Sequence, residues 1–357
     1  MYQALYRKWR PMSFDDVVSQ PHITTTLKNQ IKSGKTAHAY LFTGSRGTGK
    51  TTCARIFAKA INCLDPHDGE PCLECEICKD ADNGTLSDII EIDAASNSKV
   101  DDIRELREGV VYTPERCKYK VYIIDEVHML SAGAFNALLK TMEEPPPHVK
   151  FILATTEIHK VPATIVSRCQ HFDFHRIRNE DIVSRLMYIA SQEGFTAGMI
   201  ARLSDGGMRD ALSLLDQCVA YENDITLDVV SSASGIAGRD YLFDILEKIA
   251  DKDAAGALRV VDKLYDMSKD LKVLAGELLA QMRNVMIIKT IDNNKDLITC
   301  LPDEYERLKA LAERMKLDEI LGDINTLQEC SERFAKSTSK RIELEMCIIN
   351  LCGASQK

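Results

Sequence analysis

Apolar residues in the first half of the chain gather in short runs that alternate with helical patterns. Two of these runs, VYIID and FILAT, are apolar without alternation, as in strands that are covered on both faces. Helical periodicity is present between them, in segments such as 50–62 and 131–144. The alternation predicts an α/β domain with a mainly parallel sheet. The predicted strands are 39–44, 87–95, 119–127, 149–156 and the shorter 169–174.

The strand pattern ends at about residue 178, and helical patterns continue to the end of the chain. Segments 178–194 and 206–223 are amphipathic and predict a small helical module. From about residue 226 onward every segment has helical periodicity, for example 271–291 and 339–353. We therefore expect an α/β domain at 1–178, a small helical domain at 179–224 and a larger all-α domain at 225–357.

The composition is that of an ordinary globular protein, with 45% hydrophobic and 28% charged residues among 357. A net charge of -9 argues against a uniformly basic nucleic-acid-binding surface, although a local basic surface is compatible with it. The amino terminus, MYQALYRKWRP, lacks the apolar segment of a signal peptide, and no run of about 18 apolar residues occurs. We expect a cytoplasmic protein without a membrane partner.

The octapeptide GSRGTGKT satisfies the pattern G-x-x-x-x-G-K-[ST]. A predicted strand precedes it and a predicted helix follows it, so phosphate binding is favoured over an ordinary glycine turn. Glycines let backbone N–H groups turn toward phosphate oxygens, the lysine reaches the outer phosphates, and the last hydroxyl binds Mg²⁺. The predicted phosphate-binding residues are Gly44, Ser45, Arg46, Gly47, Thr48, Gly49, Lys50, Thr51 and Thr52.

A nucleotide site also needs a carboxylate for magnesium, and the run VYIIDEVH supplies one where an apolar strand ends. Asp125 is expected to hold Mg²⁺ through water, and Glu126 to polarise the attacking water as general base. The alternative is an acidic pair that merely begins a loop, which its place at the end of a second strand disfavours. The string NKD at 294–296 lacks the spacer of the guanine-reading pattern N-K-x-D, so ATP is favoured over GTP.

Four of the twelve cysteines lie within sixteen residues, in the order C-x8-C-x2-C-x2-C. Four thiolates at this spacing suffice for a closed tetrahedral Zn²⁺ site. Iron is the alternative metal, but the fourth cysteine and the proline of C-x2-C-x2-C-x3-C-P are absent. Because a closed shell leaves no position for substrate, we expect a folding device apart from the ATP pocket, whose loss leaves ATP binding near normal. The predicted ligands are Cys63, Cys72, Cys75 and Cys78, in a module at 63–83.

Longer motifs carry a family resemblance over nearly all of the chain. In order, they are YRKWRPMSFDDVVSQ, HAYLFTGSRGTGKTT, the four-cysteine segment, IIEIDAASNSKVDDIRELRE, YIIDEVHMLSAGAFNALLKTMEEPP, FILATTEIHKVPATIVSRCQHFDF and GGMRDALSLLDQ. They closely resemble the bacterial DNA polymerase III gamma/tau subunits, the AAA+ ATPase motors of replicative clamp loaders. The resemblance implies an α/β P-loop (AAA+) domain with an inserted zinc module, a small helical lid domain and an all-α collar domain.

The resemblance also assigns roles that spacing alone does not. Arg168, in the tripeptide SRC, matches the family's arginine finger, which enters the ATP site of a neighbouring subunit. Without the resemblance, Arg168 is interpreted as a surface ion-pair residue. Arg209 matches sensor 2, which couples the ATP phosphates to the lid. Thr155 and Thr156 occupy the sensor 1 place, and the sequence does not distinguish between them.

The amino-terminal segment resembles the part of the family that packs around adenine and ribose. Core packing explains its two valines nearly as well. The family also carries zinc at the four cysteine positions. The adenine-side residues that the resemblance implies are Tyr6, Arg7, Arg10, Pro11, Val17 and Val18.

The resemblance implies an ATPase that uses ATP and Mg²⁺ within the DNA polymerase III holoenzyme to load a sliding clamp on primed DNA. The chain itself has no recognisable polymerase active site. Implied partners are further gamma/tau copies, the delta and delta prime subunits, the sliding clamp, and primer-template DNA contacted through its phosphates.

Two other hypotheses come from different classes. A AAA+ helicase or branch-migration motor shares the YIIDEVHML element, but the helical final third favours an oligomerisation collar and no winged-helix DNA reader is evident. A nucleotide-binding scaffold without hydrolysis is the third hypothesis, and the complete set of Lys50, Thr51, Asp125 and Glu126 disfavours it.

Overall fold

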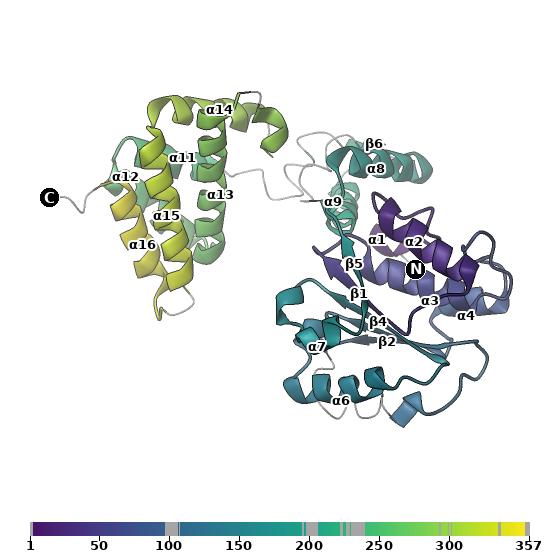
Figure 1. Ribbon diagram of the computed structural model, residues 1–357. Coiled ribbons are helices and arrows are strands. Elements are labelled where there is room, and N and C mark those ends of the chain that lie inside the picture. The colour runs from purple at the N-terminus through teal and green to yellow at the C-terminus, as the bar shows by residue number, and fades with distance from the viewer. Residues whose placement is uncertain are drawn as a thin grey trace. The chain divides into compact units, whose positions relative to one another are not determined.

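The computed structural model describes residues 3–96, 106, 108–194, 196–197, 206–221, 224–225, 229, 240–292, 294–298, 300, 302–334 and 337–353. The chain divides into two compact units, Met1–Val229 and Val230–Lys357 (Figure 1). None of the helices in the described ranges combines the length and the apolar character needed to cross a membrane.

A five-stranded sheet with the strand order β2-β3-β4-β1-β5 is the centre of the first unit (Figure 1). All of its pairings are parallel, which confirms the predicted α/β domain. The runs without alternation are β3 and β4, whose residues are almost all buried. The strands are β1 (Ala39–Gly44), β2 (Ile89–Asp93), β3 (Lys120–Asp125), β4 (Val149–Thr155) and β5 (Gln170–Phe174).

Two apolar clusters cover the two faces of this sheet. Leu41 and Tyr122 pack with side chains of α6 on one face. Their chain neighbours Phe42 and Ile123 pack with α2 and α3 on the other, because successive strand side chains point to opposite faces. The helices of this α/β part are α1 (Leu5–Lys8), α2 (Pro21–Ser33), α3 (Lys50–Asn62), α4 (Glu76–Asn83), α6 (Ala132–Glu143) and α7 (Ala163–Val166), with the 3-10 turns η1 (Val127–Met129) and η2 (Ile158–Lys160).

The strand order decides which loops meet. Because β4 lies between β3 and β1 and all three are parallel, their carboxyl ends share one edge of the sheet. At that edge β1 leads into the predicted phosphate loop, β3 ends at Asp125 and β4 ends at Thr155. Ligand sites of open parallel sheets lie at such an edge.

The predicted small helical module consists of α8 (Asn179–Glu193) and α9 (Met208–Tyr221). The expectation that strands end at about residue 178 is wrong in one detail, because β6 (Thr196–Ala197) and β7 (Asp224–Ile225) form a short parallel pair. Two-residue strands are too short to show alternation, so the sequence pattern could not reveal them.

Every regular element that the structure describes in the second unit is a helix, as predicted. The long helix α13 contributes Leu278, Met282 and Val285 to the core and packs mainly against α15 and α14. Its helices are α11 (Asp240–Ala250), α12 (Ala254–Asp266), α13 (Leu271–Thr290), the 3-10 turn η4 (Asn294–Leu297), α14 (Pro302–Arg314), α15 (Leu317–Arg333) and α16 (Lys340–Leu351).

Candidate functional site

The phosphate loop has the backbone that its glycines predict. Gly44, Gly47 and Gly49 have φ angles of +134°, +77° and +104°, a region that L-residues with a Cβ rarely adopt. The Thr48 hydroxyl donates to the Ser45 carbonyl at 2.9 Å and closes the loop. The helix α3 begins directly after Gly49, so its amino-terminal N–H groups lie beside the loop, whereas the Arg46 side chain is exposed.

Lys50 turns back onto its own loop. Its Nζ donates to the carbonyl oxygens of Gly44 at 2.8 Å and Ser45 at 2.7 Å. Burial lowers the pKa of Lys50 below its ordinary value, and the carboxylates of Glu126 and Asp125 oppose this shift. A poorly solvated ammonium group of this kind favours an anionic ligand.

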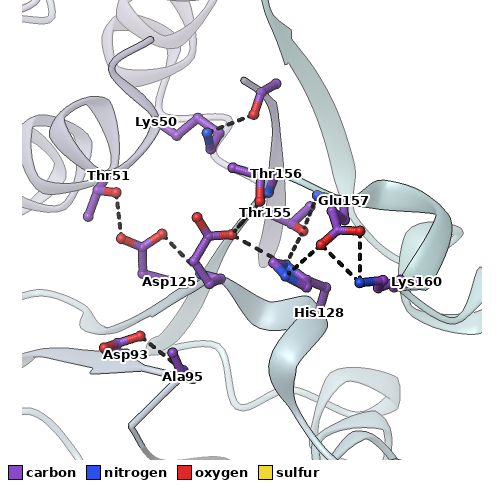
Figure 2. Close-up of polar contacts among 12 residues, drawn as sticks. Lys50, Thr51, Asp93, Ala95, Asp125, His128, Thr155, Thr156, Glu157 and Lys160 are labelled. Atoms are coloured by element: carbon purple, nitrogen blue, oxygen red, sulfur yellow. Dashed lines mark hydrogen bonds and ion pairs between the residues drawn. The ribbon is translucent and has the colours of Figure 1, made fainter. Parts of the chain in front are cut away.

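The residues predicted to bind magnesium lie in direct contact. The Thr51 hydroxyl donates to Oδ2 of Asp125 at 2.7 Å, from α3 to the end of β3 (Figure 2). The other oxygen of Asp125 accepts the backbone N–H of Glu126 at 3.0 Å. A hydroxyl and a carboxylate are oxygen ligands of the type that Mg²⁺ prefers.

Glu126 is held by the residue that follows β4. The backbone N–H and the hydroxyl of Thr156 both donate to Oε2 of Glu126, at 3.1 and 2.9 Å. Nδ1 of His128 lies 3.3 Å from the same oxygen. Glu126 has a φ of +47°, which is uncommon for a residue with a side chain. Three contacts and a left-handed backbone therefore fix the position of this carboxylate.

Thr155 has different partners from its neighbour. It is fully buried, and its hydroxyl oxygen lies 2.9 Å from Nδ1 of His128 (Figure 2). The same oxygen accepts the backbone N–H of Glu157, and Nε2 of His128 lies 3.4 Å from the Glu157 carboxylate. We did not predict a role for His128 or Glu157. The available signal was the position of His128 inside DEVHML, directly after the acidic pair.

The amino-terminal segment reaches the first turn of α3. Nε of Arg10 donates to the hydroxyl of Thr52 at 3.1 Å. Burial and the nearby Arg55 lower the pKa of Arg10 to about 10. The Arg209 and Arg7 guanidinium groups lie over the Tyr6 ring, at 5.2 and 5.7 Å from its centroid.

The small helical module touches the phosphate loop through backbone atoms of the segment that leads into α9. The N–H of Met208 donates to the carbonyl of Gly47 at 3.1 Å. A Cβ on Gly47 would lie 3.1 Å from Cα of Gly207, so the two glycine backbones are in close contact. Arg209 is carried by the same segment, at the start of α9.

Val17 and Val18 line an open cavity of about 610 Å³. Its walls come from residues 14–24, from Arg178 and from side chains of α8 that include Tyr188. The other predicted adenine-side residues, namely Tyr6, Arg7, Arg10 and Pro11, are not among its lining residues.

Arg168 lies outside the cluster around Lys50 and Asp125. Its Nη1 donates to the carbonyl of Thr164 at 2.7 Å and its Nη2 to the Glu143 carboxylate at 2.8 Å. The side chain keeps 33% of its surface exposed.

The four predicted metal ligands converge. The four sulfur atoms all lie within 4.8 Å of one another, with Cys63 to Cys75 at 4.0 Å and Cys72 to Cys78 at 3.9 Å. Four thiolates around one zinc ion at about 2.3 Å lie about 3.8 Å apart, so the donor set fits a tetrahedral ion. Backbone N–H groups of Cys72, Cys75 and Cys78 donate to the sulfurs of Cys63, Cys72 and Cys75, which favours thiolates.

Comparison with known protein families accounts for most of the chain. Three family models match successive parts of the chain: "DNA polymerase III, delta subunit" at residues 19–178, "DNA polymerase III clamp loader subunit, ATPase lid domain" at 181–224, and "DNA polymerase III subunits gamma and tau domain III" at 225–357.

Among solved structures, the RuvB Holliday junction branch migration motor of Thermotoga maritima is similar over 68% of this chain and 79% of that chain. The identity is 20% and the TM-score is 0.48, which is too low to establish a common overall fold.

Curated relatives have higher sequence identity to this chain than that structure has. DNA polymerase III subunit tau of Bacillus subtilis is 44% identical over 362 residues, which cover 100% of this chain and 64% of that protein. The chain thus spans less than two thirds of that relative. DNA polymerase III subunit gamma of Buchnera aphidicola subsp. Acyrthosiphon pisum is 35% identical over 360 residues, which cover 99% of both chains. The chain therefore belongs to the DNA polymerase III gamma/tau subunit family.

Proposed function

We propose that the chain is the ATP-hydrolysing motor subunit of the bacterial replicative clamp loader, and that it loads the sliding clamp on primed DNA. The observation that carries this proposal is the convergence of Lys50, Thr51, Asp125, Glu126 and Thr156 at one edge of the sheet. A scaffold that only binds nucleotide has no need of a carboxylate held at the end of β3.

Each residue of this cluster has a distinct role. Lys50 leaves its loop carbonyls to bind the β- and γ-phosphates, and the loop N–H groups hold the remaining phosphate oxygens. Thr51 and Asp125 hold Mg²⁺, which neutralises charge on the phosphates when bound. Glu126 orients the attacking water and accepts its proton, and Thr156 fixes the carboxylate for this step.

Zinc is the proposed ion of the cysteine cluster. An iron–sulfur cluster needs room for several metal and sulfide ions, whereas sulfur atoms within 4.8 Å of one another leave space for a single ion. Bound zinc crosslinks the module and contributes to its folding, because the segment holds few apolar residues of its own.

Arg168 is proposed to act in trans. Its guanidinium lies apart from the phosphate loop of its own chain and keeps a third of its surface exposed, as expected of a group that enters a neighbour's ATP site. There it would neutralise charge that develops on the transferred phosphoryl group. Arg209 is proposed as sensor 2, because its segment contacts the backbone of the phosphate loop.

The proposed assembly contains further gamma/tau copies together with delta and delta prime subunits. It acts in the cytoplasm on the sliding clamp and on primer-template DNA, whose phosphates supply the contacts. The proposed domain boundaries are 178/179 and 224/225, with the helical unit acting as the collar.

The test is hydrolysis by the chain alone and in a reconstituted loader, with and without clamp and primed DNA. We expect a low basal rate that clamp and DNA stimulate only in the assembly, and its loss in Lys50→Ala together with ATP binding. Processive unwinding of duplex DNA would instead support a helicase. A stoichiometric assembly that never hydrolyses ATP would support a scaffold.

A further inference from the structure

The cysteine module at 63–83 contacts the segment that lines the cavity. Between its first two ligands, Glu70 extends a mostly buried side chain whose exposed fraction is 15%. Its Oε2 accepts the backbone N–H of Phe14 at 2.8 Å, and its Oε1 accepts the backbone N–H of Asp15 at 3.1 Å. The same carboxylate pairs with Nζ of Lys28 on α2.

The loop that carries Glu70 lies tightly on α2. A Cβ on Gly69 would lie 2.6 Å from the carbonyl oxygen of Lys28, and the φ of Gly69 is +81°. Reciprocal backbone hydrogen bonds between His67 and Glu70, at 3.1 and 2.8 Å, close the turn. The metal ligands Cys63 and Cys72 stand on either side of this turn, so a metal at their sulfurs fixes both of its ends.

The segment that Glu70 contacts has little structure of its own. Residues 11–20 form neither helix nor strand, so the N–H groups of Phe14 and Asp15 have no ladder partners. Phe14 is buried, and both residues line the cavity together with Val17 and Val18. The conformation of this wall therefore depends on the two acceptor oxygens that the module supplies.

We propose that the cysteine module braces the base-side wall of the nucleotide pocket, and that Glu70 is the positioning residue through which it does so. This inference rests on the proposed function and on the family resemblance, which implies that Val17 and Val18 of this wall pack around adenine and ribose. Metal loss is then transmitted to nucleotide affinity through Glu70. The module is more than a separate folding device, which changes the expectation drawn from the sequence.

The test is competition for a fluorescent ATP analogue by ATP and by inorganic tripolyphosphate, with the full chain and its variants. Removal of both acceptors in Glu70→Ala should weaken ATP binding about tenfold or more and leave tripolyphosphate binding unchanged. Glu70→Gln keeps one carbonyl acceptor, so its ATP affinity should lie between those of the wild type and Glu70→Ala. Asp68→Ala is the matched control, because the exposed Asp68 pairs only with Lys32 among the described residues of α2.

Zinc content of each variant is measured in parallel, and it should remain at the wild-type value. ATP binding at wild-type strength by a folded Glu70→Ala protein would overturn the proposal, as would equal weakening for ATP and tripolyphosphate. If Glu70→Ala does not fold, the same comparison in Glu70→Gln decides. Failure of the wild-type chain to bind ATP would instead contradict the proposed function.

Discussion

The hydroxyl and the backbone N–H of Thr156 both donate to the same oxygen, Oε2, of Glu126. Nδ1 of His128 also lies against this oxygen, so in the proposed function the opposite oxygen, Oε1, is the one offered to a water. Fixing one oxygen removes the rotational freedom that a glutamate at the end of a strand would otherwise keep. These two hydrogen bonds to Glu126 therefore distinguish Thr156 from Thr155, which contacts His128 and Glu157 instead.

Thr156→Val should lower the turnover of the assembled ATPase and leave ATP affinity unchanged. The substitution removes one hydrogen bond to a charged acceptor, worth about 1.5–3 kcal/mol, which corresponds to roughly 10- to 100-fold in rate. Thr156→Ser keeps the hydroxyl and should retain most of the activity. Steady-state hydrolysis and nucleotide titration measure the two effects separately, and an equal loss in Thr156→Ser would argue against the hydroxyl.

Arg168→Ala should lower the stimulated rate of ATP hydrolysis by the assembly roughly 10³-fold or more, while the variant still binds ATP. The control is Glu143→Ala, which removes the carboxylate that pairs with Arg168 inside its own chain. That variant should hydrolyse ATP at the wild-type rate or faster, because the guanidinium is freed. Intact stimulated hydrolysis in Arg168→Ala would show that the finger assignment is wrong.

The purified protein should contain one zinc per chain and be colourless, and Cys75→Ser should lose the metal. Loss of a structural metal should lower the free energy of unfolding by roughly 3 kcal/mol or more, measured by denaturant titration. Cys300→Ser is the control: Cys300 lies in the other unit and is not a predicted ligand, so this variant should contain as much zinc as the wild type. A brown protein would instead favour iron. Weakened ATP binding in folded Cys75→Ser protein would agree with the brace formed by Glu70.

Asp323, on α15, should make stability depend on pH. Its Oδ2 is buried without a hydrogen-bond partner among the described residues, and burial raises its pKa to about 6. Since the pKa in the unfolded chain is about 3.9, the neutral acid favours folding below that value, and this stability is lost as pH rises through about 6.

Asp323→Asn should therefore raise the melting temperature at pH 8, by roughly 2–6 °C, and change it little at pH 4. Calorimetry at both pH values provides the measurement. The matched control is Asp266→Asn, because Asp266 is exposed near the end of α12. An equal gain at both pH values would mean that the buried charge is not the cause.

The sequence predicted those parts of the fold and site whose information is local. The strand before Gly44 and the helix from Lys50 follow from periodicity and from the glycine pattern, and the cysteine spacing is sufficient for one tetrahedral shell. The family resemblance added the proposed roles of Arg168 and Arg209, because the local sequence around each arginine does not by itself indicate a function.

Contacts between distant residues could not be predicted in this way. Whether Thr155 or Thr156 faces Glu126 depends on how β4 aligns with β3 at their ends. The Glu70 carboxylate accepts backbone N–H groups of residues 14 and 15, which lie 56 and 55 positions away in the sequence. Almost every residue has such an N–H group, so the residue types at these positions do not indicate the contact. The sequence therefore does not distinguish Glu70 from the other acidic residues of the module.

Lys50 donates to two carbonyls of its own loop, while Thr51 donates to Asp125. In the proposed function, a small metal-free anion such as inorganic phosphate would replace the first set of contacts but not the second, because it brings no metal to the hydroxyl and the carboxylate. A polyphosphate with bound magnesium would replace both sets. The internal pairing would then favour metal-bound over metal-free phosphate ligands.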